Sequence, residues 1–327
     1  MTKMYMVEAV RAALHEEMER DPSIILLGED VGIQGGVFRA SEGLQKAFGE
    51  ARVMDTPLAE SGIIGVAIGA AANGMHPVAE IQFADFIHSA MDQIISEAAR
   101  IRYRSNGGWG CPLVIRAPYG GGVHGGLYHS QSVEAFFCHV PGLKVVVPST
   151  AYDTKGLLKA AIRDPDPVMF FEHKKLYRAA REDIPDDDYV LPIGKATVVR
   201  QGTDVSVITY GLMARLALEA AEQLAGEGIQ TEVVDLRTLV PLDLQAILDS
   251  VRKTSRALVV YEDNLTLGFG AEVAALIGDK AFDALDAPVM RLASPDIPAF
   301  PYHPALESAC MPDAAKIADA IRRLRAY

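Results

Sequence analysis

Continuous runs of apolar residues recur along this chain, and they constrain its fold more than any other feature. Such Val- and Ile-rich runs, without polar alternation, are typical of strands buried on both faces of a sheet. Segments with the apolar spacing of helices separate them. Strands that alternate with helices predict an α/β fold with parallel sheets. We therefore expect doubly wound parallel sheets rather than a β-sandwich or a helical bundle.

The same pattern predicts two domains. The expected strands are residues 24–27, 77–83, 112–116, 143–147, 168–172, 205–210, 231–236, 257–261 and 288–292. The expected helices are 8–20, 62–74, 86–103, 153–163, 214–225, 244–251, 271–282 and 314–324. Between His173 and Pro192 the chain is polar and contains prolines, as is typical of a connection between domains. We expect one domain over residues 1–185 and a second over 186–327.

Composition excludes several classes of protein. A chain of 327 residues with 50% hydrophobic and 23% charged residues is long enough for two globular cores. Its formal net charge of −12 argues against nucleic acid or anionic membrane as a partner, because phosphate binding needs clustered Lys and Arg. The most apolar helical stretch, residues 63–72, is shorter than the ~20 residues that cross a bilayer.

The location is predicted from cysteine usage and from the start of the chain. Cys111, Cys138 and Cys310 are far apart and show no zinc or disulfide spacing, which fits a reducing compartment. The first 13 residues include Glu8 and Arg11 and lack the apolar core of a signal peptide. We therefore expect a cytoplasmic protein.

Two polar segments are candidates for one site. Glu60 precedes an expected helix rich in small residues, where a carboxylate either complements the helix dipole or works on a bound cofactor. The second segment is the glycine run 120–126, followed by His129. Glycines allow a backbone to approach a ligand closely, although a mobile surface turn has the same composition. Parallel sheets bind ligands at the carboxyl ends of their strands, where both segments are expected.

His129 is a candidate for proton transfer because histidine titrates near neutrality. The alternatives are a structural histidine or a catalytic role for the neighbouring His124. Ser130 and Ser132 suggest hydrolase chemistry, but no GxSxG nucleophile elbow accompanies them. The remaining histidines have no spacing typical of metal ligands.

Several motifs in order along the chain resemble one known family over nearly its whole length. They are LGEDVG (27–32), DTPLAE (55–60), AEIQFADF (79–86), LYHSQS (127–132), KGLL (155–158), FFE (170–172), DLRT (235–238) and GFGAE (268–272). The chain is similar to the β subunit of the thiamine diphosphate-dependent 2-oxo acid dehydrogenase component, of pyruvate or branched-chain type. Residues 82–86 and 171–179 look most like the branched-chain enzymes.

The resemblance implies a pyrimidine-type thiamine diphosphate domain followed by a transketolase C-terminal-like domain. It implies that Glu60 contacts the aminopyrimidine ring and shares a proton with a ring nitrogen, and that Leu58, Gln82 and Phe86 surround that ring. Branched-chain relatives usually have Tyr at position 86, so a packing contact is kept here and a hydroxyl hydrogen bond is not. His129 would act near the reacting carbon during acyl transfer to lipoamide.

The resemblance also implies metals and partners. Members of the family can hold potassium through backbone carbonyls, here those near Cys111, Leu113, Val114, Ala161, Asp164 and Asp166. The Gly-Asp-Gly motif by which thiamine enzymes hold magnesium and diphosphate does not occur in this sequence. A separate α subunit is therefore expected to supply Mg²⁺ and to complete the site in an α2β2 heterotetramer, which passes acyl groups to a lipoyl-bearing acyltransferase component.

The function that this resemblance implies is oxidative decarboxylation of a branched-chain 2-oxo acid, as in 2-oxoisovalerate dehydrogenase, with acyl transfer to lipoamide. The nearest alternative is the pyruvate or acetoin version, which shares the same motifs. A rival of another class is a noncatalytic docking scaffold of a multienzyme complex. A self-sufficient transketolase-like enzyme is a further alternative, and the missing metal motif argues against it.

Overall fold

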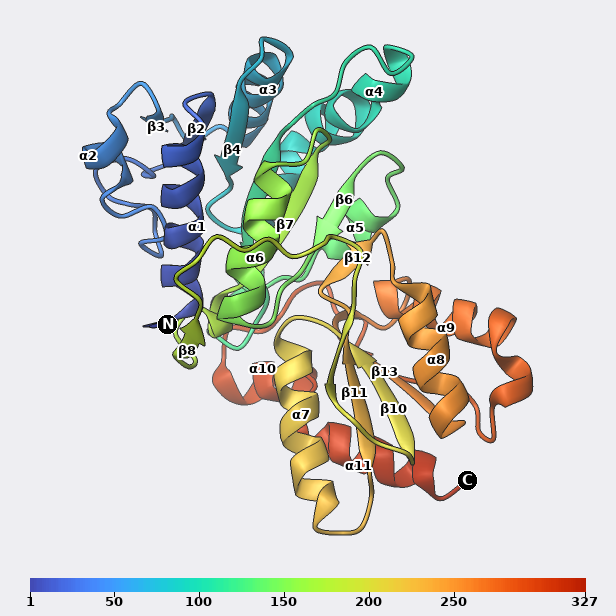
Figure 1. Ribbon diagram of the computed structural model, residues 1–327. Helices are drawn as coiled ribbons and strands as arrows, with labels where there is room; N and C mark the ends of the chain where they lie inside the picture. The colour runs from blue at the N-terminus through green and yellow to red at the C-terminus, as the bar shows by residue number, and fades with distance from the viewer. The chain divides into compact units, whose positions relative to one another are not determined.

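The computed structural model describes residues 1–327, which divide into two compact units (Figure 1). The first unit contains residues 1–119 and 136–193, and the second contains residues 120–135 and 194–327. Segment 120–135 therefore packs with the second unit although the chain on both sides of it belongs to the first. Both units are α/β, so the expected fold class is confirmed.

The sheet of the first unit carries its strands in the order β6-β7-β5-β4-β2-β3, each parallel to its neighbours. These strands are β2 (Ile24–Gly28), β3 (Val53–Asp55), β4 (His76–Glu80), β5 (Val114–Tyr119), β6 (Lys144–Val146) and β7 (Val168–His173). A separate antiparallel pair joins β1 (Thr2–Met4) to β8 (Glu182–Ile184). Every residue of β2, β5 and β7 is buried, as continuous apolar runs predict.

Two groups of helices pack in the first unit. The long helix α1 (Met6–Arg20) lies beside α6 (Ala151–Ile162) (Figure 1). The helix α3 (Glu60–Ala72) packs on β4 and on the irregular segment that follows it. Shorter elements are the helix α2 (Leu44–Phe48) and the 3-10 turn η5 (Lys174–Leu176), and the short helix α5 (Glu134–Cys138) begins in the second unit and ends in the first.

The helix expected over residues 86–103 is not one regular helix. It is built from the 3-10 helix η1 (Ala84–Ala90), the π-helix η2 (Gln93–Glu97), the 3-10 turn η3 (Ala98–Arg100) and α4 (Ile101–Arg104). Apolar spacing indicates a helical segment but does not distinguish the 3-10, α and π types, whose hydrogen bonds join residues three, four and five positions apart. The expectation of a single helix there was wrong in this respect.

The second unit has a sheet in the order β14-β13-β10-β11-β9. Its strands are β9 (Thr197–Arg200), β10 (Val205–Thr209), β11 (Thr231–Asp235), β13 (Ala257–Asn264) and β14 (Met290–Ser294), and the short β12 (Thr238–Val240) follows β11. The pairings are parallel except that β9 runs antiparallel to β11 at one edge. The sheet is therefore mostly parallel, as expected, with an edge strand that was not anticipated.

Helices cover both faces of this second sheet. Its elements are α7 (Leu212–Ala225), α8 (Leu244–Thr254), α9 (Phe269–Lys280), α10 (Pro304–Cys310) and α11 (Ala314–Arg325), with the 3-10 turns η4 (Gly126–Tyr128) and η6 (Phe282–Ala284). The helices α7 and α11 pack together, as do α8 and α9, and Figure 1 shows α7 and α8 on opposite sides of the sheet. This two-sided covering is the doubly wound arrangement.

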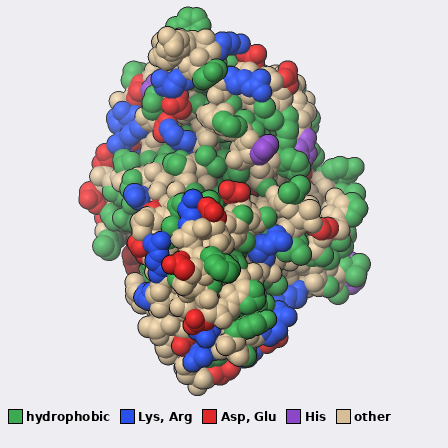
Figure 2. Space-filling model, turned by 90° about the vertical axis from the view of Figure 1, so that its right-hand side faces the viewer, with side chains coloured by type: hydrophobic (Ala, Val, Ile, Leu, Met, Phe, Trp, Pro, Cys, Tyr) green, Lys and Arg blue, Asp and Glu red, His purple; other side chains and the backbone are tan.

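The surface mixes charges of both signs. Figure 2 shows acidic and basic side chains interspersed with hydrophobic ones on the displayed face.

All three cysteines are free thiols, and burial raises the pKa of Cys111 to about 12. None of the helices has the length and apolar character needed to cross a membrane.

Candidate active site

Glu60 is the first residue of α3 and the acidic residue of its first turn. The side chain is half-buried, and its Oε2 accepts a hydrogen bond from Ser89 Oγ at 3.1 Å. The same hydroxyl lies 3.2 Å from the carbonyl oxygen of Phe86. Ser89 therefore connects the start of α3 to η1, and it brings Glu60 close to Phe86. The positive end of the helix dipole favours a carboxylate at this position.

The other residues predicted around Glu60 lie in the same unit. Leu58 comes two residues before α3, and its side chain is 69% exposed. Gln82 is half-buried in the connection between β4 and η1. Phe86, also half-buried, meets Phe83 edge to face with 6.0 Å between ring centroids. The site therefore combines one carboxylate with apolar and aromatic side chains. They lie at the start of α3, which follows β3, and in the segment that follows β4.

Glu29 is a residue of this site that sequence reasoning did not assign. It follows β2 directly and is half-buried. Burial raises its pKa, and the charges of Asp30 and Glu60 raise it further. Glu29 therefore lies near enough to sense the charge of Glu60. The signal was present in the sequence as two consecutive acids at the carboxyl end of an apolar run, which is where ligands of parallel sheets bind.

In the same unit, a buried ion cluster joins three neighbouring strands of the sheet. Arg116 of β5 is fully buried and donates to Glu172 of β7 at 2.6 and 2.7 Å and to Glu80 of β4 at 2.5 Å. The Tyr177 hydroxyl donates to Glu172. Burial raises the pKa of Glu80, although the charge of Arg116 lowers it. The cluster fixes the strand ends from which the segment with Gln82 continues.

His129 lies in the second unit, within residues 120–131, which we call the histidine loop. The loop holds the turn η4, and the backbone N–H of His129 lies 3.5 Å from the carbonyl of Gly126. Gly125 packs closely on His129, because a Cβ added to Gly125 would lie 2.6 Å from the Cβ of His129. Leu127 and Tyr128 beside it are 60% and 65% exposed.

The residues predicted to hold potassium lie together in the first unit, around β5 and α6. Several of their carbonyls already accept backbone hydrogen bonds: Cys111 from Leu113, Leu113 from Val168, and Ala161 from Asp164. A carbonyl oxygen has two lone pairs, so those of Cys111 and Leu113 keep capacity for a cation, whereas that of Ala161 also accepts the N–H of Arg163. The side chain of Asp164 pairs with Lys144 at 2.6 Å. Ligation through its carboxylate would compete with that lysine.

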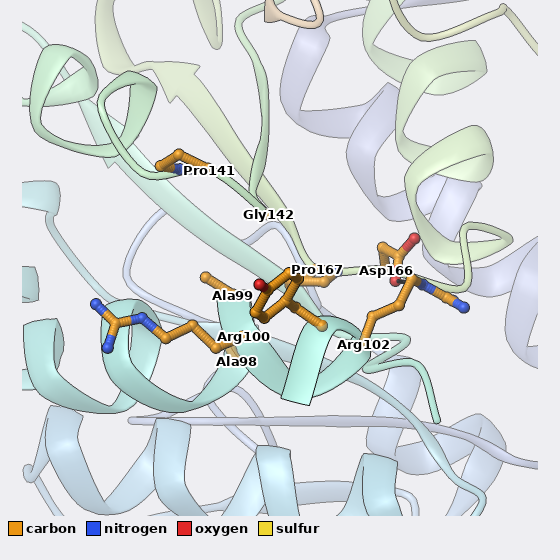
Figure 3. Close-up of a pocket in the computed structure, with 9 residues that line it drawn as sticks. Ala98, Ala99, Arg100, Arg102, Pro141, Gly142, Asp166 and Pro167 are labelled. Carbon is orange, nitrogen blue, oxygen red and sulfur yellow. Dashed lines mark hydrogen bonds and ion pairs between the residues drawn. The ribbon is translucent and has the colours of Figure 1, made fainter. Parts of the chain in front are cut away.

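A pocket of about 630 Å³ borders this region (Figure 3). Its lining includes Arg100, Tyr103, Pro141 and Pro167, and the carboxylate of Asp166 at its edge pairs with Arg102 at 2.5 Å. No group of three or more His, Cys, Asp or Glu side chains in residues 1–327 is arranged to hold a metal ion.

Comparison with known proteins assigns this fold to a class. Residues 2–180 match the family model of the transketolase pyrimidine-binding domain, and residues 194–317 match that of the transketolase C-terminal domain. A solved structure described as a split-gene transketolase, an inactive β4 tetramer, superposes with a TM-score of 0.78 at 25% identity and covers 99% of both chains. The class is therefore a two-domain chain of transketolase type.

Individual relatives narrow the class. The chain is 59% identical over 327 residues to the 2-oxoisovalerate dehydrogenase subunit beta of Bacillus subtilis, covering 100% of both. It is 51% identical over 324 residues to the pyruvate dehydrogenase E1 component subunit beta of the same organism, covering 99% of both. It is also 51% identical to a mitochondrial 2-oxoisovalerate dehydrogenase subunit beta 2 of Arabidopsis thaliana, covering 98% of this chain and 88% of that one. The chain belongs to the β subunits of the 2-oxo acid dehydrogenases, and the expected family is confirmed.

Proposed function

We propose that this chain is the β subunit of a branched-chain 2-oxo acid dehydrogenase that decarboxylates 2-oxoisovalerate and related 2-oxo acids and transfers the acyl group to lipoamide. The observation that carries the proposal is the placement of Glu60, a half-buried carboxylate at the start of α3 and beside η1. Full-length identity of 59% to a 2-oxoisovalerate dehydrogenase subunit supports the substrate class.

The residues around Glu60 fit the pyrimidine ring of thiamine diphosphate. Leu58 exposes an apolar side chain, and Phe86, whose backbone carbonyl accepts from the same Ser89 hydroxyl as Glu60, has an aromatic one. When bound, thiamine diphosphate supplies the nucleophilic carbon and the electron sink for decarboxylation. Glu60 would hold a proton between its carboxyl oxygen and a ring nitrogen. Leu58, Gln82 and Phe86 would orient the ring and exclude water from this proton.

His129 is proposed to act in acyl transfer to lipoamide, as a proton donor or acceptor near the reacting carbon. Its half-buried position in the histidine loop keeps the imidazole accessible while its backbone is held. His124, the alternative, contacts Glu307 with its Nδ1 at 2.6 Å. That contact favours a structural role for His124 and leaves His129 as the catalytic candidate.

We propose an α subunit as the partner, in an α2β2 assembly with a lipoyl-bearing acyltransferase. The α subunit would supply Mg²⁺ and the groups that hold the diphosphate, because the Gly-Asp-Gly motif is absent from this chain. The outer face of α3 offers a packing surface: Val66 is 62% exposed, and a Cβ added at Gly65 or Gly69 would meet no atom within 4 Å. Potassium ligation by carbonyls in the β5–α6 region and a cytoplasmic location belong to the same proposal.

The substrate is tested by reconstitution with the α subunit encoded nearest to this chain's gene. Turnover of 2-oxoisovalerate and pyruvate would be compared at equal cofactor concentration. The proposal predicts a higher kcat/KM for 2-oxoisovalerate, and a strong preference for pyruvate would assign the pyruvate dehydrogenase function instead. The 51% identity to pyruvate dehydrogenase subunits makes that enzyme the second candidate.

A further inference from the structure

The histidine loop is closed on itself. The N–H of Gly120 donates to the carbonyl of Gln131 at 3.0 Å, so the two ends of the loop meet. Across it, the Gln131 side-chain amide donates to the carbonyl of Gly126 at 3.1 Å. Compact loops of this kind are held by a small number of contacts from their own side chains and from the elements beneath. The place of His129 therefore depends on identifiable contacts.

A buried carboxylate from α10 binds the turn that precedes His129. Glu307 is 1% exposed, and its Oε1 accepts the backbone N–H of Gly122 at 2.9 Å and of His124 at 3.3 Å. Its Oε2 lies 2.6 Å from Nδ1 of His124. Gly122 and His124 have left-handed φ angles of 76° and 58°. Backbone N–H groups turned toward one point in this way form an anion-binding concavity, and here an acid of the same chain fills it.

Glu307 also reaches the other side of His129. Ser130, the residue after it, has its Oγ 3.5 Å from Oε1 of Glu307 and accepts the N–H of Gly125 at 3.0 Å. Gly125 in turn packs on His129. The chain on both sides of His129 is thus tied to one carboxylate. Loss of that carboxylate would release residues 122–125 and Ser130 together.

A second buried acid holds the base of the loop. Glu262 accepts the N–H of Gly121 at 2.6 Å and the hydroxyl of Ser132 at 2.9 Å. Its contacts lie outside the turn that carries His129. With the base held by Glu262, a change at Glu307 is expected to loosen the turn without unfolding the unit.

We propose that Glu307 is a positioning residue for acyl transfer, which holds the histidine loop so that His129 stays in its reactive place. The proposal rests on the role proposed above for His129. Misplacing a catalytic group by about 1 Å can reduce a rate by about 10²-fold. The steps that depend on the first unit, up to the loss of carbon dioxide, do not use His129 and are expected to be unaffected.

The test uses Glu307→Gln and Glu307→Asp in the full chain, assembled with its α subunit. Glu219→Gln, at an exposed position of α7, is the matched control. Two rates are measured: decarboxylation with an artificial electron acceptor, and acylation of free lipoamide. Hydrogen exchange of the amides of residues 120–131 is followed in each variant. Ser130→Ala is a second variant, which removes the hydroxyl between Gly125 and Glu307 and leaves Glu307 in place.

For Glu307→Gln we expect kcat for lipoamide acylation to fall about 10- to 100-fold, with decarboxylation within about twofold of the wild type and faster exchange at Gly122 and His124. Glu307→Asp, which keeps the charge, should restore part of the acylation rate. Equal loss of both rates would indicate a general structural role, and unchanged acylation or unchanged exchange would also overturn the proposal. The wild-type chain assembled with its α subunit is the reference. If its loop amides show the expected hydrogen exchange but the assembly decarboxylates no 2-oxo acid, both the proposed function and the role of Glu307 are refuted.

Discussion

In the first unit, the buried acids Glu80 and Glu172 flank the guanidinium of Arg116, which donates to both. In the second unit, Glu134 is fully buried and accepts a hydrogen bond from Tyr210 at 2.8 Å, and burial followed by the charge of Asp263 raises its pKa well above the ordinary value. Burial likewise raises the pKa of Asp263, to about 6. The first two acids are paired with a buried cation, whereas burial without such a partner raises the pKa of the other two.

Buried carboxylates therefore serve two purposes in this chain. Acids paired with a buried arginine form a scaffold that is costly to break, because loss of the cation leaves buried charges without a partner. Glu262 and Glu307 accept hydrogen bonds from hydroxyl and backbone N–H groups and hold the histidine loop. In the same unit, the raised pKa values of Glu134 and Asp263 make stability sensitive to pH. The scaffold lies in the unit that carries Glu60, and the second arrangement lies in the unit that carries the histidine loop.

The largest expected effect comes from breaking the scaffold. Arg116→Met would leave Glu80 and Glu172 buried without their cation, and we expect a loss of about 3–5 kcal/mol in the free energy of unfolding. Urea unfolding of the purified chain measures it. Arg102→Met is the control, because Arg102 pairs with Asp166 near the surface and should cost at most about 1 kcal/mol. Similar losses in both variants would contradict the distinction.

A smaller effect is expected from Asp263→Asn, and it depends on pH. Because the folded state binds this proton more tightly than the unfolded chain, the stabilisation is fully present below pH 3.8 and is lost as the pH rises through about 6. The variant should therefore gain up to about 3 kcal/mol at pH 8, because a shift of one pKa unit corresponds to about 1.4 kcal/mol, and less at pH 5. Thermal unfolding at the two pH values checks this. A gain of equal size at both would show that the ionisation of Asp263 has no part in it.

The next effect concerns a hydroxyl that holds an acid. Ser132→Ala removes the donor to Glu262, which is 3% exposed, and we expect a loss of about 1–2 kcal/mol in the free energy of unfolding. Ser308→Ala, at an exposed position of α10, is expected to change stability by less than about 0.5 kcal/mol. If both variants have the same free energy of unfolding, the Ser132 hydroxyl does not stabilise the buried carboxylate of Glu262.

The smallest effect is expected at an exposed ion pair. Arg322→Met breaks the contacts of Arg322 with Glu227 and Asp319, all of them solvent-accessible. Exposed pairs contribute about 0–1 kcal/mol, so the unfolding transition should move little and should lose its dependence on salt at this position. A loss of unfolding free energy as large as that of Arg116→Met would show that burial does not determine how much an ion pair contributes to stability.

Much of the fold could be predicted from the sequence, because buried parallel strands leave continuous apolar runs. The runs near Ile24, Val168 and Val205 each become a central strand. The edge strand β9 was missed, since half of its residues are exposed and it has no such run. The irregular segment from η1 to α4 was also missed, because apolar spacing does not encode the helical hydrogen-bond type.

The candidate site was predicted in part. Glu60 could be placed at the start of a helix from local residues alone, and the structure puts it there. Glu307 could not be found, because its contact with Gly122 joins residues 185 positions apart and arises only from tertiary packing. Arg116 left a signal that was not used: a charged residue at the end of an apolar run, matched by Glu80 and Glu172 at the ends of two others.

The carboxylate of Glu60 is expected to take part in the chemistry, and the variant Glu60→Gln removes it while keeping the shape of the side chain. The variant and the control Glu219→Gln would each be assembled with the α subunit, and initial rates of 2-oxoisovalerate decarboxylation compared at saturating thiamine diphosphate and Mg²⁺. Removal of a proton-transfer group predicts a fall of about 10²- to 10⁴-fold with the assembly intact. A rate within about twofold of the control would contradict the account and favour a noncatalytic scaffold.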